Sequence, residues 1–200
     1  MSTELTQEIM EWEEWASTAD RKEDGWESYY PDWLSLMKCA AHCMCKYIGD
    51  DAVFAALERC WSLSQEGEEL LDFAQENIQE CFNVLVKLVE SDDSGVRWQV
   101  YVALASAGLK GEPIIRAGLE DSDNYARRRA LLSLVQLRPV DGDELAERFM
   151  VDKDPYMRQA SAKLLLGTRN QELLGRAGKI LLNDPVDFVK EAAKELLPLE

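Results

Sequence analysis

The chain has 200 residues, 46% of them apolar, so it can bury a hydrophobic core as one elongated domain or as two small ones. No apolar run reaches membrane-spanning length, and the first residues lack the basic and apolar regions of a signal peptide. We therefore expect a cytoplasmic protein with no membrane association. Five cysteines, an odd number, favour reduced thiols over a disulfide framework.

The net charge of -16 is concentrated in the first half of the chain. Residues 1–93 carry 22 acidic and 6 basic side chains, whereas residues 94–200 carry 16 of each. Such a field repels nucleic acid and attracts a basic protein, whose association it accelerates at low salt. The alternative is that the charge serves solubility alone.

Residues 3–19 predict an amphipathic helix with two tryptophans, Trp12 and Trp15, on its apolar side and glutamates around the remainder. Glu11 and Glu14 on the acidic side are candidate partner-binding residues. Large aromatics at helical spacing are usually core, so we expect Trp12 and Trp15 to be buried, and Trp33 as well.

Residues 20–31 predict a loop, marked by Gly25 and Pro31, that is rich in aromatic residues. If Trp26, Tyr29 and Tyr30 are exposed, they are anchors of the kind enriched in interface hot spots. If they are buried, they cover the open end of the helical array. The sequence leaves both interpretations open.

Three more helices are expected before residue 91: one capped by Asp32 and ending near Ile48, one over 52–62, and a long one over 68–90. The first places Cys39, His42 and Cys43 at i, i+3 and i+4 on one face. With Cys60 or Cys81 from a neighbouring helix, these are soft ligands of the kind that hold zinc. The paired C-x-x-C spacing is missing and Cys is readily buried, so the sequence favours a structural role, with no metal or cofactor.

Other catalytic machinery is scarce. His42 is the one histidine, which removes most Ser-His and Cys-His schemes, and the sequence has neither a Gly-rich phosphate loop nor a dinucleotide fingerprint. We therefore expect a protein that is not an enzyme.

From residue 93 onward, one short sequence motif, which we call the phrase, occurs four times. The four copies are Asp93-Ser-Gly-Val-Arg97, Asp123-Asn-Tyr-Ala-Arg127, Asp154-Pro-Tyr-Met-Arg158 and, more loosely, Asp184-Pro-Val-Asp-Phe-Val-Lys190. The basic residues lie 30, 31 and 32 positions apart. Each follows an apolar residue, and a small residue and a Leu stand three and seven positions after it. This period predicts a helical repeat whose units stack and bury one another's faces.

The repeat predicts pairs of helices. The first members, which carry the phrase, are expected over 94–107, 124–137, 155–166 and 185–197, and the shorter second members over 112–120, 141–150 and 170–182.

The phrase Asp-Pro-x-x-Arg with its small and Leu positions resembles a HEAT repeat of the short, phycobilisome-lyase-like kind, over residues 88–200. The resemblance implies an all-α fold with a right-handed α-solenoid of HEAT-like pairs over 91–200. The four helices expected over 1–90 lack the phrase, so we expect them to form a divergent, acidic, aromatic-rich helical bundle that packs on the first repeat. The resemblance further implies a structural ladder in which the aspartates cap helices and the arginines reach the neighbouring repeat. The ladder residues are Asp93, Arg97, Asp123, Arg127, Asp154 and Arg158. Lys190 and a displaced Asp184 suit a terminal capping unit.

By the same resemblance the second helices line a concave face, where Arg116, Glu144, Arg148 and Arg176 are candidate partner-binding residues. This groove is mixed in charge, and a nucleic-acid-binding protein would show a basic stripe there. The triplet Arg127-Arg128-Arg129 is the one basic cluster, and one member is expected in the ladder.

The sequence thus favours a non-enzymatic protein-binding module whose acidic, aromatic first half docks a basic protein. A small acidic binder of this type resembles bacterial immunity proteins that neutralise toxins. Two alternatives remain open. One is a metalloprotein, lyase or other enzyme that uses Cys39, His42 and Cys43, and the other is a structural adaptor in a larger assembly.

Overall fold

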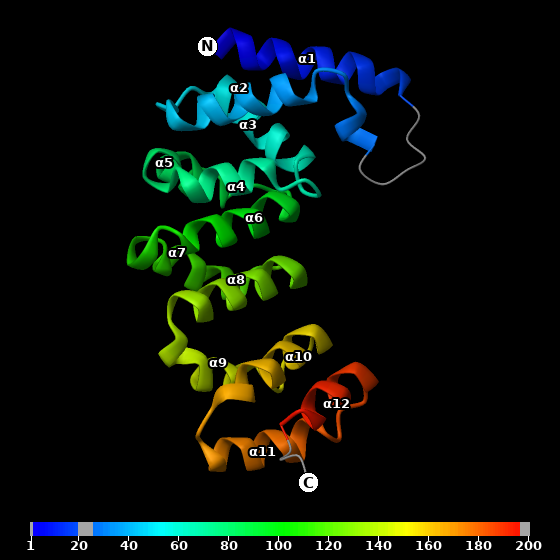
Figure 1. Cartoon of the computed structure of the whole chain (residues 1–200), viewed down its shortest axis with the longest axis vertical. Helices are drawn as coiled ribbons and strands as arrows, with labels where there is room; N and C mark the ends of the chain where they lie inside the picture. The colour runs from blue at the N-terminus through cyan, green and yellow to red at the C-terminus, as the bar shows by residue number, and fades with distance from the viewer. Residues whose placement is uncertain (1, 20–25, 197–200) are drawn as a thin grey trace. The chain divides into compact units, whose positions relative to one another are not determined.

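A computed structural model describes residues 2–19 and 26–196, which contain twelve α-helices, five short 3-10 helices and no strand (Figure 1). The all-α prediction is therefore confirmed. The chain divides into two compact units, Met1–Ile114 and Ile115–Glu200. This boundary lies within α7 (Glu112–Ala117), whereas the change in sequence character falls near residue 90.

The first unit contains six complete α-helices. They are α1 (Ser2–Thr18), α2 (Trp33–Cys45), α3 (Asp51–Leu63), α4 (Glu69–Glu76), α5 (Ile78–Leu88) and α6 (Ser94–Ala105), with the 3-10 helices η1 (Trp26–Tyr29) and η2 (Gly108–Lys110). Helix α1 packs against α2 and α3, α2 packs against α4 and α5, and α6 packs against α3, α4 and α5. Leu5, Leu36, Trp61 and Leu85 are among the fully buried side chains at these contacts.

The second unit contains five complete α-helices. They are α8 (Asn124–Leu137), α9 (Gly142–Phe149), α10 (Pro155–Leu164), α11 (Gln171–Leu181) and α12 (Asp187–Lys194), with η3 (Gly118–Glu120), η4 (Pro139–Asp141) and η5 (Leu165–Gly167). Helix α10 packs against α8, α9 and α12, and α11 packs against α9 and α12. Ala146, Leu165, Leu173, Leu181 and Val189 belong to the core between them.

The repeated phrase produces the predicted buried positions. Four apolar residues before the basic positions, Val96, Ala126, Met157 and Val189, are fully buried. So are the small residues Val100, Ala130, Ser161 and Ala193 and the leucines Leu104, Leu134 and Leu165, whereas Leu197 lies outside the described residues. The apolar register read from the sequence is therefore confirmed wherever the structure describes it.

The single long helix expected over 68–90 is wrong, because the chain breaks at Asn77 between α4 and α5. The side-chain amide of Asn77 donates to the Phe73 carbonyl at 2.9 Å, and the Asn77 backbone N–H donates to the same oxygen at 3.0 Å. An Asn side chain that satisfies a backbone group locally offers the chain an alternative to a continuous helix. Asp32 precedes α2 but makes no capping hydrogen bond, so that predicted cap is also wrong.

Candidate functional site

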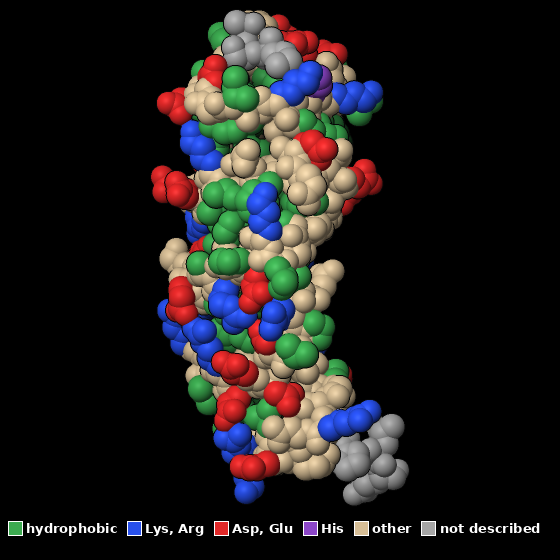
Figure 2. All heavy atoms as spheres, turned by 90° about the vertical axis from the view of Figure 1, so that its left-hand side faces the viewer, with side chains coloured by type: hydrophobic (Ala, Val, Ile, Leu, Met, Phe, Trp, Pro, Cys, Tyr) green, Lys and Arg blue, Asp and Glu red, His purple; other side chains and the backbone are tan. Residues whose placement is uncertain are grey.

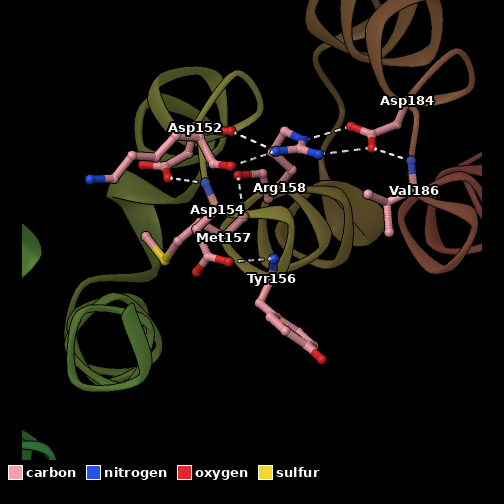
Figure 3. A network of polar contacts seen from close by, with 9 residues as sticks. Asp152, Asp154, Tyr156, Met157, Arg158, Asp184 and Val186 are labelled. Carbon is pink, nitrogen blue, oxygen red and sulfur yellow. Dashed lines mark hydrogen bonds and ion pairs between the residues drawn. The ribbon is translucent and has the colours of Figure 1, made fainter. Parts of the chain in front are cut away.

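Arg158 on α10 is the centre of a polar network that joins two copies of the repeat (Figure 3). Its Nε and Nη2 donate to Asp184 Oδ2 and Oδ1 at 2.6 and 2.9 Å, a bidentate pairing, and its Nη1 donates to the carbonyl of Asp152 at 2.8 Å. Asp184 also accepts from the Val186 N–H at 2.9 Å. The guanidinium of Arg158 lowers the pKa of Asp184, since it favours the charged carboxylate. Arg158 therefore fixes its own turn and the turn that begins α12.

The second copy, which contains Arg127, repeats the arrangement. Arg127 is nearly buried, and its Nη2 donates to Asp152 at 2.9 Å, 25 residues further along the chain. In the first copy, Arg97 donates to the carbonyls of Ser91 and Asp92 at 2.8 and 3.0 Å. The aspartates predicted to cap helices do so. The capping contacts are Asp93 to the Gly95 N–H at 2.7 Å, Asp123 to Ala126 at 2.9 Å and Asp154 to Tyr156 at 3.1 Å.

The side-chain acceptors of Arg127 and Arg158 are a second set of aspartates, Asp152 and Asp184, which the sequence analysis did not identify. They stand six positions before the basic residue of the next copy, and Asp121 and Ser91 occupy the same position in the earlier copies. The interpretation of Asp184 as a displaced cap is therefore wrong, because Asp184 aligns with Asp152 and Val186 occupies the uncapped position. The sequence does contain a signal for them, because an Asp-x-Asp spacing occurs in the second and third copies, at Asp121 and Asp123 and at Asp152 and Asp154.

Three of the predicted partner-binding residues of the second helices make ion pairs within the second unit. Arg116 Nη2 lies 2.8 Å from Asp141 Oδ2, Arg176 pairs with Glu147 at 2.5 Å, and Arg148 pairs with Glu120. Glu144 is exposed. Figure 2, in which the left-hand side of Figure 1 faces the viewer, shows basic and acidic side chains interspersed over the second unit. These arginines already have counter-ions, so a partner there would have to compete for them.

The acidic face of α1 carries the predicted partner-binding carboxylates. Glu11 and Glu14 are both exposed, and Gln7 donates to Glu11 at 2.7 Å. The α1 sequence contains no basic residue between Ser2 and Thr18. An uninterrupted acidic helix of this kind is a surface of one charge sign.

The aromatic residues near α1 form a cluster, which we call the aromatic cluster: Trp12, Trp15, Trp26 and Tyr30. Trp26 stacks on Trp15 with ring centroids 5.8 Å apart, and Trp15 lies 5.4 Å from Tyr30. Trp12 is buried as expected, whereas Trp15 is half-buried.

The three aromatics of the predicted loop have different exposures. Tyr29 is 62% exposed, Trp26 is half-buried and Tyr30 is only 7% exposed, and burial raises the pKa of Tyr30. Tyr30 is therefore packed inside and is not available as an anchor, which corrects its selection as a contact residue. Trp33 is half-buried rather than buried, with its Nε1 donating to Glu69 at 2.9 Å. Residues 20–25 of the loop lie outside the described residues.

Two cavities of about 410 Å³ each lie beside the aromatic cluster and share Glu27, Ser62, Leu63 and Gln65 in their linings. Trp12 lines one of them, and its buried indole N–H has no hydrogen-bond partner among the described residues. The guanidinium of Arg59 lies 4.8 Å from the Trp12 ring. This part of the first unit therefore combines aromatic rings with carboxylates and one stacked cation.

The cysteine-histidine constellation does not converge. His42 is exposed and its Nε2 lies 2.9 Å from Lys46 Nζ, whereas Cys43 is buried and hydrogen-bonded to Cys39. Burial raises the pKa of Cys39 to about 12, and the pKa of Cys60 is raised by the same cause. Across the described residues, no group of three or more His, Cys, Asp or Glu side chains has an arrangement suited to a metal. Thiols held in their neutral form are poor nucleophiles and poor metal ligands.

No protein-family model matches the sequence, and comparison with curated proteins also finds no match. No helix in the described part of the chain is long and apolar enough to cross a membrane.

Proposed function

We propose that this protein is a non-enzymatic binding module whose first unit docks a basic protein. The observation that carries the proposal is the charge of that unit: residues 1–114 contain 23 acidic and 8 basic side chains, whereas residues 115–200 contain 15 and 14. A surface with one charge sign accelerates encounters with a partner of opposite sign and repels nucleic acid and anionic membranes.

The docking surface that we propose is the exposed side of α1 with η1. Glu11 and Glu14 supply charge, and Tyr29 with the exposed part of Trp26 supplies aromatic area. Trp and Tyr are enriched among the residues that dominate interface binding energy. Neutralisation of a basic toxin, as by an immunity protein, is the biological role that we propose for such a complex.

For the fold, we propose a right-handed α-solenoid of HEAT-like pairs. The support is the contact repeated at a fixed sequence distance: Arg127 reaches Asp152 and Arg158 reaches Asp184, 25 and 26 residues further on. The same aspartates accept the N–H of the residue two positions later, Asp154 and Val186. Contacts that recur between successive units are the property that defines repeat proteins.

The enzyme and metalloprotein alternatives receive less support. They require His42 and the thiols to act together, but His42 contacts Lys46 and the thiols lie in apolar surroundings that raise their pKa. No specific contact favours the adaptor alternative.

The test of this proposal is a charge reversal at Glu11→Lys with Glu14→Lys. The matched control is Glu172→Lys with Glu195→Lys, which changes the net charge equally at exposed positions of the second unit. Each protein is immobilised and used to capture partners from the source cell at about 50 and 300 mM salt, spanning a Debye length of about 14 to 6 Å. We expect one stoichiometric basic protein that the wild type and the control retain at low salt and the α1 variant loses.

Two results would count against the proposal. If both variants lose the partner equally, net charge rather than the α1 surface is responsible. If the captured protein is acidic, or is retained equally at both salt concentrations, docking through the acidic unit is wrong.

A further inference from the structure

The second unit carries a groove with a chemistry opposite to that of α1. It lies between α8 and α10, has a volume of about 270 Å³ and is lined by Tyr125, Arg128, Arg129, Leu132, Tyr156, Gln159, Ala160 and Lys163. We call it the α8–α10 groove. Three of these residues are cations and none is acidic, in a chain that has 38 acidic residues. We propose that the α8–α10 groove binds an acidic, extended peptide segment of a partner protein.

The groove is a product of the repeat. Tyr125 and Tyr156 each stand two positions before the ladder arginine of their copy, and Phe188 stands at the same position of the last copy. The guanidinium of Arg128 lies 5.0 Å from the Tyr125 ring and 4.9 Å from the Tyr156 ring, and Tyr156 stacks on Phe188 at 4.9 Å. Arg128 is therefore held between two rings, which orients its planar donors at little further cost in conformational entropy.

Two of the three cations, Arg128 and Lys163, carry the uncompensated charge of the groove. Among the described residues, neither Arg128 nor Lys163 lies within 4.0 Å of a carboxylate, although Arg116, Arg148 and Arg176 of the same unit all do. Tyr125 and Tyr156 are also 43% and 50% exposed. Cations without counter-ions, next to exposed aromatic rings, are suited to a ligand that brings both carboxylates and apolar groups.

The spacing of the cations favours an extended segment. By repeat register Arg128 is equivalent to Gln159, and Lys163 follows Gln159 by four residues, an axial offset of about 6 Å on an α-helix. Alternate residues of an extended chain are about 6.7 Å apart and point to the same side. Arg128 and Lys163 also lie on different helices, whose axes are about 8 to 10 Å apart when packed, so a ligand that reaches both must be extended and carry several alternating carboxylates.

Nucleic acid is the other class of ligand with affinity for aromatic and basic side chains. Three cations are few for a backbone with a charge on every nucleotide, because affinity for nucleic acid depends chiefly on the number of phosphates that the protein neutralises. The groove therefore favours carboxylates over a phosphate backbone.

The test uses fluorescence anisotropy with the full chain and a fluorescein-labelled peptide in which four Glu alternate with Thr. The comparison ligands are the same peptide with Gln for Glu and a single-stranded oligo(dT) of twelve nucleotides. The variant is Arg128→Glu with Lys163→Glu, and the matched control is Arg169→Glu with Lys179→Glu, which reverses two exposed cations outside the groove lining. Circular dichroism melting establishes that each variant is folded.

We expect the Glu peptide to bind the wild type and the control equally, and to bind the groove variant at least about tenfold more weakly at 50 mM salt. Tyr156→Ala, which removes one of the two rings that hold Arg128, should weaken binding without changing the net charge.

Four outcomes would overturn the proposal. They are equal binding by the groove variant, equal binding of the Gln peptide, binding of oligo(dT) in preference to the peptide, and absence of peptide binding by the wild type. If instead sedimentation shows a concentration-dependent dimer that the groove variant abolishes, the occupant is a second copy of this chain, and the partner-peptide proposal fails.

Discussion

Removing the Arg158 side chain should destabilise the second unit strongly. Arg158→Ala deletes the bidentate pair with Asp184 and the bonds to the carbonyls of Asp152 and Lys153. The Asp184 side chain is 4% exposed and the Arg158 side chain 12%, so the carboxylate is left buried without its cation. Breaking a buried pair from one side costs about 3 to 5 kcal/mol, and the remaining Val186 N–H offsets part of that. We expect a loss of about 3 kcal/mol.

The assay is urea denaturation followed by circular dichroism, applied to a double-mutant cycle of Arg158→Ala and Asp184→Ala. Because both side chains belong to one network, the two losses should not add, and the coupling energy should be about 2 kcal/mol. Asp187→Ala is the matched control, since it removes an exposed partner of Lys190 in the same unit and should change stability little. A coupling energy near zero, or a stable Arg158→Ala variant, would refute the assignment of the ladder.

The same pair gives a pH dependence of known sign. Arg158 lowers the pKa of Asp184 in the folded chain below its unfolded value of about 4. The stabilisation is therefore complete above the unfolded pKa and is lost as the pH falls through the lower folded pKa. The stability difference between the wild type and Asp184→Asn should be constant from about pH 5 to 7 and should shrink below about pH 4. A difference that persists unchanged into strong acid would contradict this linkage.

Three further predictions concern individual side chains and the cysteines. Arg127→Met should lower the free energy of unfolding, measured by urea denaturation, by about 2 to 3 kcal/mol, because Arg127 is buried and ion-paired. Arg128→Met should lower it by less than half as much, because Arg128 lines the surface groove. Equal losses would contradict these placements. Asp123→Ala should cost about 1 kcal/mol in the same assay and Asp123→Asn much less, because Asn retains the capping acceptor; equal costs would remove the capping explanation. The pKa values of Cys39 and Cys81 are raised to about 12, so the native chain should react with iodoacetamide at pH 8 much more slowly than the unfolded chain. It should also contain far less than one equivalent of zinc. Rapid labelling or stoichiometric zinc would restore the metalloprotein hypothesis.

The sequence by itself determined the helical class, the repeat register and the starts of α6, α8 and α10. Apolar residues at i and i+4 lie on one side of a helix, and that side is buried. Because the repeat aligns these positions from copy to copy, it specified the core-facing side of each first helix, including Met157 and Leu165. Capping is equally local, because an Asp side chain reaches only the amides of the next few residues, and Asp93, Asp123 and Asp154 cap as predicted.

What only the tertiary structure decided are the relations between residues far apart in sequence. The exposures of Trp26, Tyr29 and Tyr30 depend on how η1 folds back onto α1, which no local pattern encodes. Likewise, the sequence shows three consecutive arginines as equivalent cations. Their roles differ because successive residues on a helix point about 100° apart. Arg127 meets Asp152 and Arg128 lies between two tyrosine rings from neighbouring copies, since only packing decides which side of α8 meets α10.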